Sequence, residues 1–289
     1  MPSRSSGFSN LLKPELHEIF FTKYSQYPDE YTQLFDVLSS TRAYEEDGEV
    51  TGLGKLVSKG EGSSITYDDP IQGELKKYTH SSFGLGFRVT HELYEDDQYG
   101  VIKRMPSALA RSAHQTVETE AWSILNNAFS TSYLGLDNQS LCSTSHPNVG
   151  VGAGSGPYSN RLATDSDLSI TSLQAAIELM ETTTDDRDLN LMIKPKTLVI
   201  PVQLKWMARE LLNSEYKPGT ANNEINALAD EELKYMVGHY LTDSDAWFLT
   251  SSKEEHYLRF FWREKVKFEN DDDFNMPSPS RATESAYVN

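Results

Sequence analysis

The chain has 289 residues, with 43 Asp or Glu and 26 Lys or Arg, which gives a formal net charge of −17. This acidity excludes gripping nucleic-acid phosphates by bulk electrostatic attraction. The single cysteine, Cys142, excludes intrachain disulfides. The chain has no run of about 18 apolar residues that would predict a membrane span, and its N-terminus lacks the apolar core of a secretion signal. Hydrophobic residues make up 38% of the chain, a low share that would suit extended arms covered by neighbouring molecules.

The first 40 residues combine a small, polar start with two helical patterns. Residues 1–10 are expected to be disordered or to form an arm. In 11–40, apolar residues recur at helical spacing on either side of Pro28 and Asp29. The two sets are Leu16, Ile19, Phe20 and Tyr24, then Tyr31, Leu34, Phe35 and Leu38. Such helices could bind a partner or pack on their own chain.

Residues 44–89 are typical of extended strands punctuated by glycine. Asp47-Gly48 predicts a tight turn and Asp68-Asp69-Pro70 a second one. The whole segment reads as one long hairpin with little apolar content for a core of its own. Because an isolated two-stranded hairpin is only marginally stable in water, we expect another surface to cover it, with a neighbouring subunit as the first candidate.

Residues 88–129 predict one long amphipathic helix, which we call the spine helix. Pro106 places its regular start near Ser107, after a separate turn at 91–96. The expected buried stripe comprises Val101, Ile102, Met105, Leu109, Ala113, Val117, Ala121, Trp122, Ile124, Leu125 and Ala128. The expected outer face comprises Arg104, Arg111, His114, Gln115, Glu118 and Glu120. A core helix of an ordinary globular protein would show the same pattern.

The second half predicts a compact α/β region. Residues 130–168 are loop-rich, and 171–183 form a helix with a capping box of Thr171 and Gln174. Residues 197–200 form a buried strand, after which Pro201 starts a helix. Further strands are expected at 233–237, 246–249 and 258–268, with a polar loop at 214–232 and an exposed tail at 270–289.

No motif predicts catalysis, so we expect no catalytic, cofactor-binding or metal site, no cofactor, and no enzyme activity. Gly52-Leu53-Gly54 and Gly84-Leu85-Gly86 do not extend into a nucleotide-binding loop. Cys142 and His146 could form a nucleophile–base pair or half a zinc site, but a thiol beside a His-Pro turn is the simpler interpretation. Asp271, Asp272 and Asp273 could hold a divalent ion, although adjacent carboxylates in a loop define no ligand geometry.

Several short segments, in this order, resemble the major head subunit of Mu-like tailed phages and prophages. They are GLG at 52–54, ITY at 65–67, FGLG at 83–86, THEL at 90–93, SHPN at 145–148, PKTLVIP at 195–201, PGTANNEIN at 218–226 and AWFL at 246–249. The resemblance implies an α+β capsid fold of the Hong Kong 97 type. Its expected parts are an N-terminal arm at 1–43, an E-loop at 44–89, a P-domain at 90–140 and 251–275, an A-domain at 141–250 and a tail at 276–289.

The resemblance also implies partners. The subunit is expected to form hexamers and pentamers of a head assembled in the bacterial cytoplasm around double-stranded DNA, without sequence-specific binding. A separate scaffolding protein, a head protease, a portal and decoration proteins are further expected partners. Cross-linking through Lys55, Lys59, Lys76 or Lys77 is not expected. The alternatives are an encapsulin-like shell around a protein cargo and a hydrolase that uses Cys142 and His146.

Overall fold

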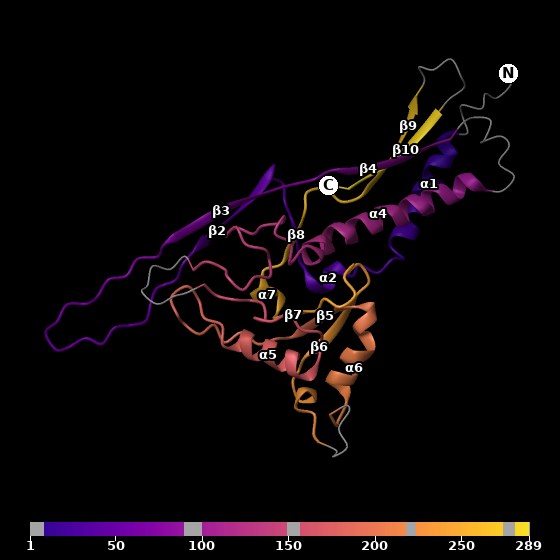
Figure 1. The fold of residues 1–289 in the computed structure, drawn as a ribbon. Helices are drawn as coiled ribbons and strands as arrows, with labels where there is room; N and C mark the ends of the chain where they lie inside the picture. The colour runs from indigo at the N-terminus through magenta and orange to yellow at the C-terminus, as the bar shows by residue number, and fades with distance from the viewer. Residues whose placement is uncertain (1–8, 90–99, 149–156, 218–223, 274–280, 289) are drawn as a thin grey trace, which may run out of the picture. The chain divides into compact units, whose positions relative to one another are not determined.

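A computed structural model describes residues 9–89, 100–148, 157–217, 224–273 and 281–288. The chain divides into two compact units. The first comprises Met1–Tyr44, Thr79–Ala121 and Arg259–Asn289, and the second comprises Glu45–Tyr78 and Trp122–Leu258. Figure 1 shows the elements of both units. Each unit is therefore assembled from segments that lie far apart in the sequence.

The first unit begins with helix α1 (Ser9–Tyr24), which confirms the first helical pattern. Phe20 is fully buried and stacks on Phe268 of strand β9 (Lys267–Asp273), with ring centroids 4.9 Å apart. The second helical pattern is mostly wrong. It gives only the short helix α2 (Tyr31–Leu34), because β1 (Asp36–Ser39) pairs in parallel with β8 (Arg259–Trp262) and takes Leu38 into a strand.

The C-terminal segment of this unit differs from the expected exposed tail. Strand β10 (Arg281–Val288) lies between β4 (Phe83–Val89) and β9, antiparallel to both. β4 was expected to belong to the hairpin, but it pairs in this three-stranded sheet instead. The polar composition of 281–288 does not predict a strand, and its partner strand β4 lies about 200 residues earlier in the sequence.

The spine helix is α4 (Val101–Asn126), and its start at Val101 corrects the expected start at Ser107. Pro106 lies inside the helix and is fully buried. Proline has no N–H, so it cannot donate the helical hydrogen bond one turn back. The turn expected at 91–96 lies outside the described residues. Most of the predicted stripe is buried, including Leu109, Val117 and Leu125, but Ile124 is exposed.

Two residues assigned to the outer face of the spine helix are buried. His114 is 5% exposed and Glu118 is 0% exposed. One Glu118 carboxylate oxygen accepts a hydrogen bond from the backbone N–H of Glu30 at 2.7 Å, and the other accepts one from Tyr31 at 3.2 Å. These N–H groups belong to the first turn of α2, where helix geometry leaves donors without partners. Glu118 therefore holds α2 on the spine helix.

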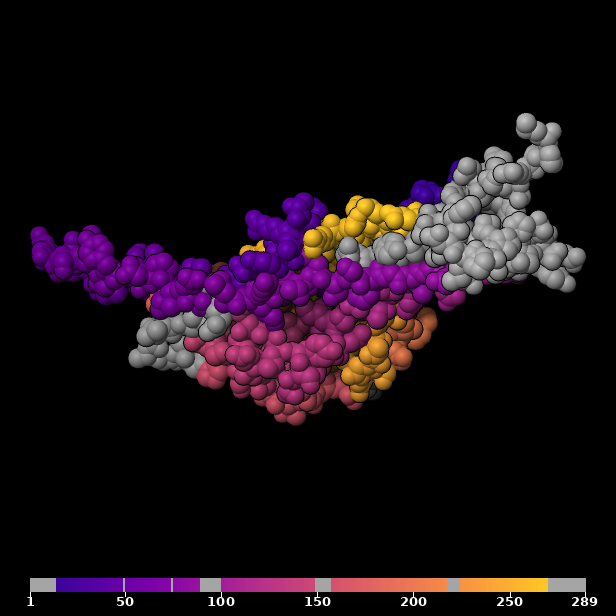
Figure 2. All heavy atoms as spheres, turned by 90° about the horizontal axis from the view of Figure 1, so that it is seen from above, coloured from indigo at the N-terminus to yellow at the C-terminus, as the bar shows by residue number. Residues whose placement is uncertain are grey.

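In the second unit, β2 (Tyr44–Val50) and β3 (Gln72–Thr79) pair as a two-stranded hairpin, as expected. The expected turn at Asp47-Gly48 is wrong, because both residues lie within β2. A side chain at Gly48 would come within 2.6 Å of Leu75, so the glycine makes room for a residue of the opposite strand. Thr51 and Ile71 exchange two hydrogen bonds of 2.9 Å and close the base of the loop at 52–70. Figure 2 shows this loop as a narrow finger of atoms.

The α/β region of this unit has a three-stranded sheet in the order β6 (Lys234–Gly238), β5 (Thr197–Pro201) and β7 (Phe248–Thr250). β5 is parallel to β6 and antiparallel to β7. The predicted strand at 197–200 is confirmed, and Leu198, Val199 and Ile200 are completely buried. Pro201 ends β5, however, and the helix follows later as η2 (Val202–Leu204) and α6 (Lys205–Asn213).

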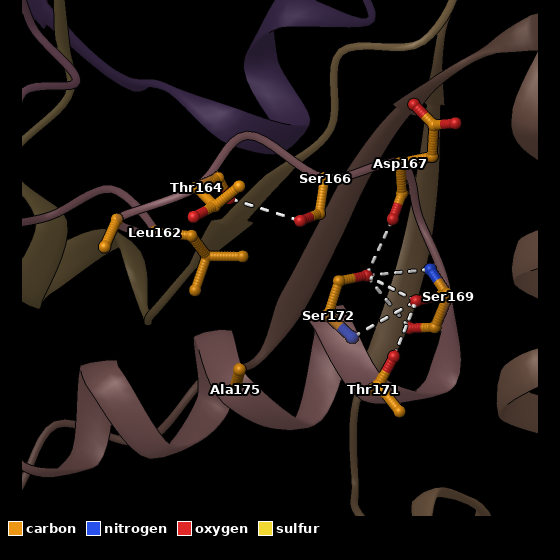
Figure 3. Close-up of a pocket in the computed structure, with 9 residues that line it drawn as sticks. Leu162, Thr164, Ser166, Asp167, Ser169, Thr171, Ser172 and Ala175 are labelled. Atoms are coloured by element: carbon orange, nitrogen blue, oxygen red, sulfur yellow. Dashed lines mark hydrogen bonds between the residues drawn. The ribbon is translucent and has the colours of Figure 1, made fainter.

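Helix α5 (Ile170–Glu181) begins earlier than expected and has a different cap. Ser169, rather than Thr171, is the N-cap residue, and its hydroxyl accepts a hydrogen bond from Ser172 N–H. The Ser172 hydroxyl accepts in return from Ser169 N–H at 2.8 Å. Figure 3 shows these serines facing one another at the start of the helix. Serine at the third helical position replaces the Glu or Gln of the usual capping box, which is why the sequence pattern missed it.

The short remaining elements are η3 (Ala227–Ala229) and helix α7 (Lys253–His256).

The sheet of the second unit packs closely on the last turn of the spine helix. A side chain at Gly238 of β6 would come within 2.6 Å of the fully buried Trp122 ring. Asn126 of α4 also hydrogen-bonds to the Tyr240 carbonyl and the Thr242 N–H, both at 3.0 Å. Burying the C-terminal end of α4 in this way positions the α/β core.

We predict that Glu118→Ala lowers the free energy of unfolding by about 1–3 kcal/mol, because it removes the acceptor of buried N–H groups. Gln115→Ala, an exposed change one turn earlier in the same helix, should alter it by less than about 0.5 kcal/mol. Urea unfolding of unassembled subunits compares the two. Equal midpoints would show that the Glu118 carboxylate does not hold α2.

Candidate functional site: the exposed hairpin

The hairpin formed by β2, β3 and the loop between them carries a dense set of exposed apolar side chains. Leu56 is fully exposed, Tyr67 is 89% exposed and Val57 is 70% exposed. The others are Tyr44, Val50, Leu53, Ile65, Leu75 and Tyr78. Single exposed apolar residues are ordinary, but a cluster within 35 residues of one hairpin marks an interaction surface.

Polar contacts fix the hairpin to its own unit without covering these side chains. Lys76 Nζ donates to the Leu134 carbonyl at 2.7 Å. Arg187 donates to the Asp69 carbonyl at 3.0 Å and lies 3.6 Å from the Asp68 carboxylate. The hairpin is therefore held by its polar groups, while Leu56, Val57 and Tyr67 are exposed.

The glycine pair at the hairpin loop does not form a phosphate cradle. Gly54 N–H donates to the Asp68 carboxylate at 2.8 Å. This hydrogen bond is the main cause that holds the pKa of Asp68 below its usual value, with Arg187 contributing as a nearby positive charge. A carboxylate occupies the position that a phosphate oxygen would need, so the structure gives no support to nucleotide binding here.

Cys142 and His146 do not form a nucleophile–base pair. The Nδ1 atom of His146 lies 2.5 Å from the Asp137 carboxylate and Nε2 lies 3.1 Å from the Asn160 side-chain oxygen. Both ring nitrogens are thus engaged by groups other than the thiol. Burial raises the pKa of Cys142 to about 11, against the opposing influence of Arg161. A nucleophilic cysteine needs a lowered pKa, so this thiol is unsuited to catalysis.

His146 instead organises the loops around it. Burial tends to raise the pKa of Asp137, but hydrogen bonds from His146 and from Gln139 N–H outweigh it and hold that pKa below its usual value. The His146 ring also stacks on Tyr158 at 5.0 Å. The backbones of the two residues exchange hydrogen bonds of 2.9 and 3.0 Å. The interpretation as a structural turn fits these contacts.

The predicted acidic site and a hollow seen in the structure are both explained by ordinary secondary-structure contacts. Asp271, Asp272 and Asp273 form the end of β9 and pair with Thr283, Ala282 and Arg281. The hollow at the start of α5 is lined by Ser166, Asp167 and Ser169 among others. The hydroxyls drawn there in Figure 3 hydrogen-bond to one another and to backbone groups of the α5 cap. Among the described residues, sequence reasoning missed one group of possible metal ligands, Asp29, His114 and Glu118.

No helix within the described ranges combines the length and apolar composition needed to cross a membrane.

A family model described as phage capsid protein matches residues 73–276. The chain belongs to the phage capsid protein family. No curated protein matches it.

Solved structures with a similar fold include capsids of a phage and of a GTA particle. The capsid of bacteriophage JBD30 decorated with minor capsid protein trimers matches with a TM-score of 0.58 and 18% identity, covering 75% of this chain and 92% of that one. The procapsid of the same phage gives 0.58 and 17%, covering 82% and 100%. The capsid of a native GTA particle gives 0.50 and 9%, covering 90% and 84%.

These likenesses confirm the predicted fold class, an α+β capsid fold of the Hong Kong 97 type. Membership in the phage capsid protein family places the protein in the virion capsid and gives it a structural role. The more specific likeness to Mu-like phages rests on the short motifs of the sequence.

We predict that Cys142 reacts slowly with a thiol reagent in the folded subunit. A pKa of about 11 leaves about one thiol in a thousand ionised at pH 8. In guanidinium, an ordinary thiol with a pKa of about 8.5 is roughly a quarter ionised at that pH. The folded chain should therefore react with Ellman's reagent at least about 100-fold more slowly than the unfolded chain. Equal rates would contradict the raised pKa.

Proposed function

We propose that this protein is the major capsid subunit of an icosahedral head that encloses double-stranded DNA. The observation that carries the proposal is the exposed hairpin in a chain of the phage capsid protein family. A subunit that keeps such a surface uncovered needs other copies to cover it. Hexamers and pentamers of the same chain provide those copies.

Within this role, each segment takes the part implied by the resemblance. Residues 1–43 act as the arm, 44–89 as the E-loop, 90–140 with 251–275 as the P-domain and 141–250 as the A-domain. β4 and β10 modify this scheme, because the second half of the proposed E-loop pairs with the chain end in the first unit. We therefore propose that 44–79 is the part of the E-loop that contacts a neighbour.

The net charge of −17 supports containment of DNA rather than binding to it. The enclosed phosphates and the shell repel one another, so the shell has to be held together by contacts between subunits. A separate scaffolding protein, a head protease and a portal would act during assembly. The JBD30 capsid is decorated by minor capsid protein trimers, and a comparable decoration protein is proposed here.

We predict that replacing Leu56, Val57 and Tyr67 together by serine abolishes closed shells while leaving the isolated subunit folded. These exposed side chains contribute nothing to the subunit core, so its unfolding free energy should change by less than about 0.5 kcal/mol. Lys59→Ser, a polar change in the same loop, is the control and should assemble normally. Sedimentation and electron microscopy measure assembly. Closed shells at the wild-type yield from the triple variant would refute the role of the hairpin.

We predict that particles purified from cells that make this protein with its head-assembly partners are closed icosahedral shells containing nuclease-resistant DNA. Electron microscopy tests the shell, and DNA quantified after nuclease treatment tests the content. Subunits expressed without the partners and treated identically are the control for DNA that merely adheres outside. Shells with a protein cargo and no protected DNA would show a compartment protein instead.

A further inference from the structure

Three potential metal ligands converge in the first unit, away from the hairpin. Asp29 lies in the connection between α1 and α2, whereas His114 and Glu118 lie one turn apart on α4. The Nε2 atom of His114 is 3.3 Å from one Asp29 carboxylate oxygen and 3.8 Å from one Glu118 oxygen. The three ligand atoms all lie within 4.8 Å of one another.

His114 is the decisive member of this group. Its side chain is 6% exposed, and its buried Nε2 atom has no hydrogen-bond partner in the described part of the chain. Buried polar atoms almost always have a partner, because leaving one unsatisfied costs about 1–3 kcal/mol. The ring packs against Tyr27, with centroids 5.3 Å apart, and against Tyr24 at 6.1 Å. Nε2 therefore lies 3.3 and 3.8 Å from two carboxylates without forming a hydrogen bond to either.

The surroundings are negatively charged and already organised. The Glu118 carboxylate is held in place by the N–H groups of Glu30 and Tyr31, and such hydrogen bonds commonly orient carboxylates that bind metals.

We propose that Asp29, His114 and Glu118 bind a first-row divalent cation, for which Zn²⁺ is the probe. Ligand atoms about 2.0–2.2 Å from a tetrahedral Zn²⁺ lie about 3.3–3.6 Å apart, close to the two distances from His114. One imidazole with two carboxylates suits Zn²⁺, Co²⁺ or Mn²⁺, whereas Mg²⁺ and Ca²⁺ prefer oxygen ligands alone. The Asp29 side chain is 46% exposed, so water can complete the coordination from that side.

The bound cation would link two segments that are far apart in the sequence, the α1–α2 connection and helix α4. Asp29 belongs to the N-terminal segment that the resemblance assigns to the arm, and His114 and Glu118 belong to the spine helix. Coordination would fix the connection between α1 and α2 on α4 more firmly than the hydrogen bonds of Glu118 do alone. This inference rests on the first unit only and does not depend on the function of the hairpin.

The test uses full-length unassembled subunits freed of metal by a chelator. Isothermal titration with Zn²⁺ should show one site per subunit, and Co²⁺ should give the visible absorption of a tetrahedral or five-coordinate complex. Asp29→Asn and His114→Gln remove one ligand each and keep the carboxylate of Glu118, which also holds α2. Each should weaken Zn²⁺ binding by about 100-fold or more and abolish the Co²⁺ spectrum, with the circular dichroism spectrum unchanged.

His146→Gln is the matched control, since His146 is another buried histidine beside a carboxylate. It should bind Zn²⁺ with wild-type affinity and retain the Co²⁺ spectrum. The absence of a stoichiometric site in the wild-type subunit would overturn the proposal. Wild-type Zn²⁺ affinity in Asp29→Asn and His114→Gln would equally overturn it.

Discussion

The hairpin cannot bury its own apolar side chains, and this constraint explains much of the organisation of the chain. A two-stranded hairpin has no interior, so it offers nothing to bury Leu56, Val57 and Tyr67 of its loop, and these side chains are exposed. Polar contacts through Lys76 and Arg187 hold the hairpin to its unit. The fold thus fixes the hairpin without covering it, as a subunit that is completed by its neighbours requires.

The spine helix contributes residues to both units and holds one element within each of them. At its C-terminal end, Trp122 packs so closely on β6 that position 238 has to be glycine. One turn before that, Glu118 supplies the hydrogen-bond acceptors that the first turn of α2 lacks. Each contact lies within one unit and uses a different force. Dispersion packing acts on β6 in the second unit, and charge-assisted hydrogen bonds act on α2 in the first.

Sequence patterns predict helices and strands whose buried residues recur with a regular period. They miss elements and burial that depend on partners far away in the sequence. The run of apolar residues at 198–200 predicts a buried strand, and the four-residue spacing of Leu109, Ala113 and Val117 predicts one face of a helix. Glu118 was assigned to solvent because its burial depends on N–H groups 87 and 88 residues away. β10 was missed for a similar reason, since its partners rather than its composition define it.

The candidate site divides in the same way. The hairpin could be inferred because a segment poor in core residues needs an outside surface, which is a local property. The Asp29, His114 and Glu118 group could not, because helical spacing brings only the last two together and nothing local places Asp29 beside them. The separation in sequence between Asp29 and the two helix residues is also why a bound cation would fix the α1–α2 connection on α4. A cation bound by residues of two separate segments stabilises their association, whereas one bound within a single helix would stabilise only that helix.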